Sequence, residues 1–200
     1  MDKESNTSTF DIIPPHLIID DFLGGEVIDA LLQHVISNEG NFVDTSVSTG
    51  KNDNSNHVDV NWRISRVLQD FGSLKKNIKQ KFIDVLPIAI QKLRTDEFNL
   101  EWLELELVAH GDKAFYKTHI DTSTNRNAET VRVITAVYYF HSQPKVFFGG
   151  QLRILPLRHN VPDSKFLDVE PINDRLLLFP SWVPHQVLPV KLEANNFIDS

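Results

Sequence analysis

The amino-acid sequence predicts an α+β fold in which covering helices come first and an antiparallel sheet, folded into a jelly roll, follows. Apolar residues recur at helical spacing before residue 95, and from about residue 100 they alternate with polar residues as in strands. A length of 200 residues suits one domain with its own core. We therefore expect one domain over residues 10–200, preceded by a flexible tail at residues 1–9.

The first predicted helix covers residues 26–37, after an extended segment in which Pro14 and Pro15 oppose helix formation. Its apolar stripe consists of Val27, Ile28, Leu31, Leu32, Val35 and Ile36. Residues 38–61 follow and are rich in Asn, Ser, Asp and Gly, which predicts a long polar loop. Such a loop is expected to form a wall or lid beside a functional site.

A second helical stretch is expected at residues 65–94. Apolar residues keep helical spacing there from Leu74 to Ile90. Gly72 should interrupt the stretch, and Pro87 should kink or break it, because proline lacks the N–H that a helix interior needs. Both helical segments are expected to cover a sheet and to take no part in chemistry.

The second half of the chain predicts strands. Leucines alternate with glutamates at residues 103–107, and apolar or Thr residues share one face of residues 131–139. Gly149-Gly150 predicts a turn or bulge before residues 151–155. Further strands are expected at residues 166–170, 174–180 and 185–190.

Composition limits the function. The net charge of −7 disfavours nucleic acid or an anionic membrane as the main partner, since both reward basic surfaces. The chain contains no cysteine, which excludes disulfides and thiolate metal sites and fits a reducing compartment. It shows no signal-peptide core and no apolar run of membrane-spanning length. We expect a soluble cytoplasmic protein, whose oligomeric state the sequence leaves open.

His119, Asp121 and His185 are the candidate metal ligands. His119 and Asp121 are two residues apart on a predicted strand, so their side chains point to the same face. His185 begins a later predicted strand that a folded sheet can bring alongside. Two imidazoles and one carboxylate form the facial ligand set of non-haem Fe(II) oxygenases. A His-x-Asp triplet is common by chance, so this pattern needs support from its context.

That context is a family resemblance carried by several blocks. They lie in order at residues 107–122, 131–140, 148–155 and 169–187, and include Thr-His-Ile-Asp, Val-Tyr-Tyr-Phe, Gly-Gly-Gln-Leu-Arg and Pro-His-Gln-Val. Together they resemble the prolyl-4-hydroxylase-like branch of the 2-oxoglutarate- and Fe(II)-dependent oxygenases. Residues 15–23 resemble the openings of that branch more weakly. The resemblance implies a double-stranded β-helix that holds Fe(II) through His119, Asp121 and His185.

The resemblance also implies a 2-oxoglutarate site. Tyr139 matches the tyrosine that meets the distal carboxylate of 2-oxoglutarate in this branch, and Thr135 shares its face of the strand. His110 falls near a position where relatives carry a pocket tyrosine. The family places a basic anchor after the distal histidine, where this chain offers only Lys191, with Arg153 as a substitute elsewhere.

The expected anchor is therefore the weakest part of the match. In relatives, an Arg follows an Asp-Ser or Asp-Gly pair such as Asp199-Ser200, so the domain apparently ends before its last core strand. Without a cation, the distal carboxylate would lose a charge-assisted hydrogen bond worth about 1.5–3 kcal/mol. We expect the 200-residue chain to bind 2-oxoglutarate weakly or to fold marginally.

The resemblance implies a dioxygenase that uses Fe(II), 2-oxoglutarate and O2, with ascorbate as a further reductant, and releases succinate and CO2. Its reaction would be hydroxylation of an unactivated C–H, most often of a prolyl residue in a protein or peptide, with a small molecule as the other substrate class. No catalytic side chain is nominated beyond the metal ligands. Two alternatives remain: a cupin-like metalloenzyme and a non-catalytic jelly-roll binding module.

Overall fold

The computed structural model describes residues 13–45, 59–123, 131–157 and 165–192. The predicted tail at residues 1–9 lies outside these ranges, as does most of the loop expected at 38–61. The elements are β1 (Leu17–Ile19), α1 (Gly25–Ser37), β2 (Val43–Asp44), β3 (Arg63–Ile64), β4 (Arg66–Leu68), α2 (Lys75–Leu93), β5 (Leu107–Ala109), β6 (Phe115–His119), β7 (Ile134–Tyr139), β8 (Phe147–Gly149), β9 (Leu152–Ile154), β10 (Leu167–Val169), β11 (Arg175–Pro180), β12 (His185–Val187) and β13 (Val190–Leu192). Single 3₁₀ turns lie at Glu39–Asn41 and Gly72–Leu74.

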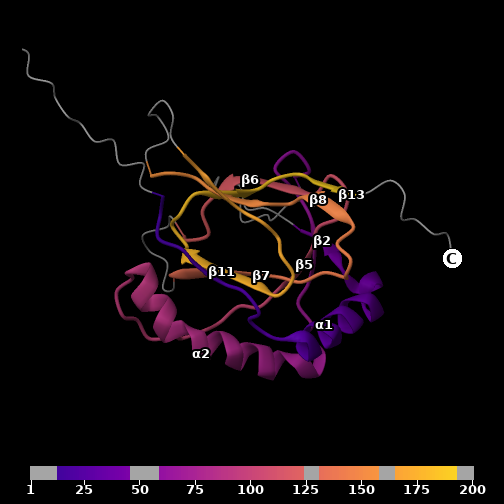
Figure 1. The fold of residues 1–200 in the computed structure, drawn as a ribbon, viewed down its shortest axis with the longest axis horizontal. Helices are drawn as coiled ribbons and strands as arrows, with labels where there is room; N and C mark the ends of the chain where they lie inside the picture. Colours follow the sequence, from indigo (N-terminus) through magenta and orange to yellow (C-terminus); the bar gives the residue numbers. More distant parts are fainter. Residues whose placement is uncertain (1–12, 46–58, 124–130, 158–164, 193–200) are drawn as a thin grey trace, which may run out of the picture.

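The described part of the chain is a mixed α/β structure whose strand pairs are all antiparallel. One sheet has the strand order β1-β11-β7, and a larger one has the order β10-β9-β12-β6-β3. Two small sheets join β13 to β8 and β2 to β4 and β5. In Figure 1, α1 and α2 lie on one side of the molecule, β11 and β7 lie next to them, and β6 and β8 lie beyond.

The first predicted helix is confirmed as α1, but the second is shorter than expected. Residues 66–68 form strand β4 and not helix, because Leu68 is buried opposite Leu107 of β5. Helix α2 begins at Lys75 and continues through Pro87 to Leu93, so the predicted break at Pro87 is wrong. The helix stays intact because apolar residues on both sides of the proline pack on the sheet, and this burial outweighs one lost hydrogen bond. No helix in the described ranges is both long and apolar enough to cross a membrane.

The predicted strands are found with shorter bounds. The alternation at residues 103–107 appears in burial, since Leu107 is buried and Glu104 and Glu106 are exposed, but only Leu107 belongs to a strand. Gly149 and Gly150 both have φ of +73°, so the predicted turn before β9 is confirmed. Four short strands were not predicted, because two or three residues carry too little periodicity: β2, β3, β8 and β13. Strand β2 lies within residues 38–61, which were expected to form a loop.

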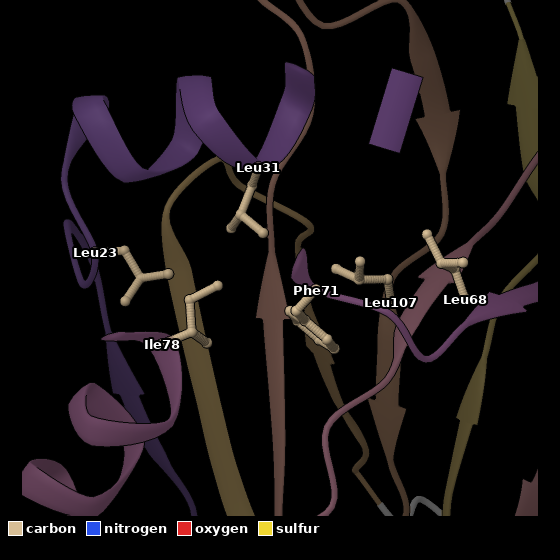
Figure 2. Close-up of a cluster of buried hydrophobic side chains, with 6 residues drawn as sticks. All are labelled: Leu23, Leu31, Leu68, Phe71, Ile78 and Leu107. Carbon is tan, nitrogen blue, oxygen red and sulfur yellow. The ribbon is translucent and has the colours of Figure 1, made fainter. Parts of the chain in front are cut away.

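Apolar side chains form three buried clusters that fix the layers. Figure 2 shows one buried cluster, to which α1, α2, β4 and β5 contribute Leu31, Ile78, Leu68 and Leu107, together with Leu23 and Phe71. A second cluster packs α2 on β11, and a third fills the space between β9, β10 and β11. The third cluster includes Val137 and Tyr139 on one face of β7, and Phe179 of this cluster contacts the ring of His185.

Candidate metal centre

Strands β6 and β12 bring the two predicted histidines together. They pair antiparallel in the middle of the five-stranded sheet, and His119 and His185 are direct partners in that pairing. The centroids of the two imidazole rings are 4.2 Å apart. The expectation that a folded sheet places His185 beside His119 is thus confirmed.

Each imidazole is held by its Nδ1 atom. His119 Nδ1 lies 2.8 Å from the carbonyl oxygen of Lys117, and His185 Nδ1 lies 2.9 Å from that of Val183. A carbonyl can only accept, so Nδ1 must carry the hydrogen in both rings. A neutral ring then has its lone pair on Nε2, as a metal-binding histidine requires.

Asp121 completes the cluster from just beyond the end of β6. Its backbone N–H donates to the carbonyl oxygen of Ser181 at 2.9 Å, which fixes it against the turn that leads to β12. One carboxylate oxygen lies 3.6 Å from His119 Nε2 and the other lies 3.5 Å from His185 Nε2. The hydroxyl of Thr135 donates to Asp121 Oδ2 at 2.8 Å and also contacts the hydroxyl of Ser181.

The donor set fits one divalent metal ion. The three ligand atoms lie within 4.8 Å of one another. Burial lowers the pKa of His119 to about 4, with a further contribution from the charge of His185, and burial also lowers the pKa of His185. Both rings are therefore neutral near pH 7 and can coordinate a metal through Nε2, while the carboxylate supplies negative charge.

A cavity of about 1220 Å³ opens beside this cluster and extends along β7. Tyr139 lines it, and its hydroxyl is a buried donor with no hydrogen-bond partner among the described residues. Burial raises the pKa of Tyr139, so the hydroxyl keeps its proton. An unpaired buried donor costs free energy, so a ligand with an acceptor oxygen would relieve that cost.

The other predicted cosubstrate residues lie in different places. Thr135 lines the cavity, but its hydroxyl bonds to Asp121 and Ser181. His110 lines the cavity, and burial lowers its pKa to about 4, with a smaller effect from Arg63. Lys191 is exposed on β13 and is not among the lining residues. Arg153 makes a bidentate ion pair with Asp168 at 2.7 and 2.8 Å, away from the cavity.

Sequence reasoning missed two parts of the site. The Ser181 hydroxyl is buried next to Thr135, and the Arg63 guanidinium lies over the ring of Tyr116, which stacks on His119. Ser181 stands between a predicted strand and His185, a position that could have indicated a turn beside the ligands. No pattern around Arg63 pointed to the site, because β3 is too short to be predicted.

Comparison with known proteins finds a family model and a relative that resemble this chain. Residues 105–198 match the model of the 2OG-Fe(II) oxygenase superfamily. An uncharacterized PKHD-type hydroxylase from Synechocystis sp. is 30% identical over 188 residues, an alignment that covers 91% of this chain. The chain spans 59% of the length of that protein.

Solved structures resemble this chain in fold. A prolyl-4-hydroxylase from Pseudomonas putida aligns with a TM-score of 0.61 at 22% identity, covering 88% of this chain and 86% of that one. A prolyl hydroxylase from Trichoplax adhaerens, solved with a peptide fragment of the hypoxia-inducible factor oxygen degradation domain, aligns with a TM-score of 0.64 at 23% identity. That alignment covers 89% of this chain and 79% of the other.

Proposed function

We propose, from the match of residues 105–198 to the model of the 2OG-Fe(II) oxygenase superfamily, that this protein is a 2-oxoglutarate- and Fe(II)-dependent dioxygenase of the prolyl-4-hydroxylase-like branch. Its reaction is hydroxylation of an unactivated C–H bond, with a prolyl residue of a protein or peptide as the favoured acceptor. We further propose that its antiparallel sheets form a double-stranded β-helix, which their fold likeness to prolyl-4-hydroxylases supports.

One observation carries this proposal: two histidines and one aspartate bring their ligand atoms within 4.8 Å of one another. Both imidazoles are fixed through Nδ1, and both Nε2 atoms face the same carboxylate. Two nitrogens and one carboxylate would hold a bound Fe(II) and leave it able to accept further ligands. A cupin-like site would need further histidines or a glutamate, and the only cluster of such residues found in the described part of the chain contains these three.

His119, Asp121 and His185 would hold Fe(II). When bound, the metal and 2-oxoglutarate together supply the oxidising chemistry, in which O2 is consumed and 2-oxoglutarate leaves as succinate and CO2. The protein orients the ligands: Thr135 and Ser181 fix the carboxylate, and the carbonyls of Lys117 and Val183 fix the imidazoles. No side chain is assigned as a general base. Ascorbate is proposed as a further reductant.

Tyr139 is the residue proposed to bind the distal carboxylate of 2-oxoglutarate. Its unpaired, protonated hydroxyl lines the cavity that contains the metal ligands, and a carboxylate oxygen is the acceptor that such a donor lacks. His110 lines the same cavity with a neutral ring, and we propose it as a second polar contact.

An anaerobic titration tests the function. Fe(II) is added to the full chain, followed by 2-oxoglutarate, and the visible spectrum is recorded. The expected result is a metal-to-ligand charge-transfer band that needs both additions and is lost in His119→Ala and Asp121→Ala. His34→Ala, which removes a histidine far along the sequence that bonds to the carbonyl of Asp70, should keep it. A chain that binds Fe(II) but shows no band with 2-oxoglutarate would contradict the proposal.

A further inference from the structure

We propose that Arg63 selects the primary substrate by binding a carboxylate that the substrate carries near its reacting carbon. This inference rests on the proposed function, because it concerns the acceptor that is brought to the metal. It assigns a specificity-determining role to a residue of β3 that the sequence did not single out.

The position of Arg63 is set by the strand pairing. Strand β3 pairs with β6, and Arg63 lies opposite Tyr116. The guanidinium carbon lies 4.6 Å from the centroid of the Tyr116 ring, and that ring stacks on His119 with centroids 3.5 Å apart. A positive charge is therefore held one aromatic ring away from a metal ligand, on the wall of the cavity.

The charge of Arg63 has no acidic partner within ion-pair distance among the described residues. Four other arginines each pair with an acidic side chain: Arg66 with Glu39, Arg132 with Glu104, Arg153 with Asp168 and Arg175 with Asp20. Arg132 is the other arginine that lines the cavity, and Glu104 neutralises it. The chain is acidic, with 27 Asp and Glu against 20 Lys and Arg, yet one cavity arginine has no carboxylate partner in the part of the chain that the structure describes.

The side chain is also fixed before any ligand arrives. Arg63 Nε donates to the hydroxyl oxygen of Ser65 at 2.7 Å, and the Ser65 hydroxyl lies 2.9 Å from that of buried Thr45. The guanidinium carbon also lies over the Tyr116 ring. An arginine held in this way loses little conformational entropy on binding, and its planar group suits bidentate contact with a carboxylate.

The carboxylate that meets Arg63 belongs to the primary substrate and not to 2-oxoglutarate. Arg63 is at the edge of the five-stranded sheet, whereas Tyr139, proposed for the distal carboxylate of 2-oxoglutarate, is on β7 of the three-stranded sheet. Because the two donors belong to different sheets, we assign them to different ligands.

Paired peptides test this directly. The probes are nine-residue peptides with one central proline in a Gly/Ala background, carrying Glu or Gln at each flanking position in turn. Isothermal titration measures their affinity for the full chain loaded with Zn(II), with and without 2-oxoglutarate. At one flanking position at least, we expect the Glu peptide to bind about 10- to 100-fold more tightly than its Gln twin.

Variants identify the residue responsible. Arg63→Gln should remove the preference for Glu, and Arg63→Lys should keep part of it because the charge remains. Arg66→Gln is the matched control: it removes a nearby arginine that pairs with Glu39 on the exposed surface, and it should keep the full preference. Circular dichroism checks that each variant is folded.

The outcomes separate this inference from the proposed function. Equal binding of Glu and Gln peptides by the wild type, no binding of either, or a preference that survives Arg63→Gln would overturn it. A tenfold loss of 2-oxoglutarate affinity in Arg63→Gln without peptide would assign Arg63 to the cosubstrate and also overturn it. Failure of the proposed function appears separately, as absence of the charge-transfer band while the Glu preference remains.

Discussion

The hydroxyl of Thr135 donates a hydrogen bond to the Asp121 carboxylate at 2.8 Å, and this links β7 to the candidate metal ligand that follows β6. Ser181 joins the same network through its hydroxyl and through the carbonyl that accepts from the Asp121 backbone. The carboxylate is therefore fixed by strand β7 and by the turn at Ser181 before a metal arrives.

Replacing Thr135 with Val should weaken metal binding about 10- to 100-fold, because the outer partner that orients the carboxylate is lost. Affinity is measured by competition with a chelator of known strength. Thr118→Val is the control, since its hydroxyl bonds to Gln186 on the exposed surface and should leave metal affinity unchanged. Equal affinities in all three proteins would contradict an orienting role.

Tyr139→Phe should weaken 2-oxoglutarate binding about tenfold, since one charge-assisted hydrogen bond is removed. Without 2-oxoglutarate it should leave stability unchanged or slightly higher, because its hydroxyl has no partner among the described residues. Tyr138→Phe is the neighbouring control: it breaks a 2.7 Å bond to Asp174 and should lower stability by about 1 kcal/mol without affecting 2-oxoglutarate. If Tyr138→Phe weakened 2-oxoglutarate binding and Tyr139→Phe did not, Tyr139 would not be the residue that contacts 2-oxoglutarate.

Asp174→Ala should lower the free energy of unfolding by about 3 kcal/mol. The buried carboxylate accepts from the backbone N–H groups of Leu23 and Gly24 at 2.7 and 2.9 Å, and from Tyr138, so its loss leaves buried donors unpaired. Asp174→Asn should cost less, because asparagine tolerates the φ of +63° and keeps one acceptor oxygen. Urea unfolding midpoints provide the comparison. Equal losses of unfolding free energy in the two variants would argue that the hydrogen bonds of Asp174 are not the source of the stability.

His110 should make the protein sensitive to acid. Burial lowers its pKa from 6.5 to about 4, so the unfolded chain binds this proton more readily than the folded chain. The effect of His110 on the free energy of unfolding is then absent above pH 6.5. As pH falls from 6.5 to about 4, His110 lowers that free energy by about 3 kcal/mol at most. In His110→Gln this part of the pH dependence should disappear. Parallel slopes for the two proteins between pH 7 and 4 would exclude His110 as its source.

Gly149→Ala should destabilise the fold by more than about 3 kcal/mol, because a Cβ there would lie 2.1 Å from the carbonyl oxygen of Pro189 and the residue has φ of +73°. Gly111→Ala, where a Cβ would meet no atom within 4 Å, is the matched control and should change little. Thermal unfolding of both variants checks the difference. A mild effect at residue 149 would mean that the turn before β9 can shift.

Much of this architecture follows from the printed sequence, because periodicity reports which face of an element is buried. The first helix, the turn at Gly149 and the strands around His119 and His185 were predicted on that basis. The candidate metal ligands were predicted from residue types that suit Fe(II), and the family resemblance of the surrounding blocks supported that choice. Strand β4 was mistaken for helix because Val67 and Leu68 fit both periods, and only the pairing with β5 decides between them.

The surroundings of the ligands were harder to predict. The bonds from Lys117, Val183, Ser181 and Thr135 depend on how strands meet in space, which periodicity does not encode. Arg63 is the clearest case: nothing local separates it from Arg66, yet one faces the cavity and the other pairs with a surface glutamate. Long-range strand pairing alone makes that distinction.

The column formed by Arg63, Tyr116 and His119 has a mechanical consequence. The Arg63 guanidinium carbon lies 4.6 Å from the Tyr116 centroid, and the Tyr116 ring stacks on His119, so a ligand that displaces the guanidinium should also displace the phenol and the imidazole. The charge-transfer band expected for the Fe(II) complex should then shift when a ligand binds to Arg63. Tyr116→Leu should abolish that shift, while Arg63 keeps its bond to Ser65 and His119 keeps its bond to the carbonyl of Lys117.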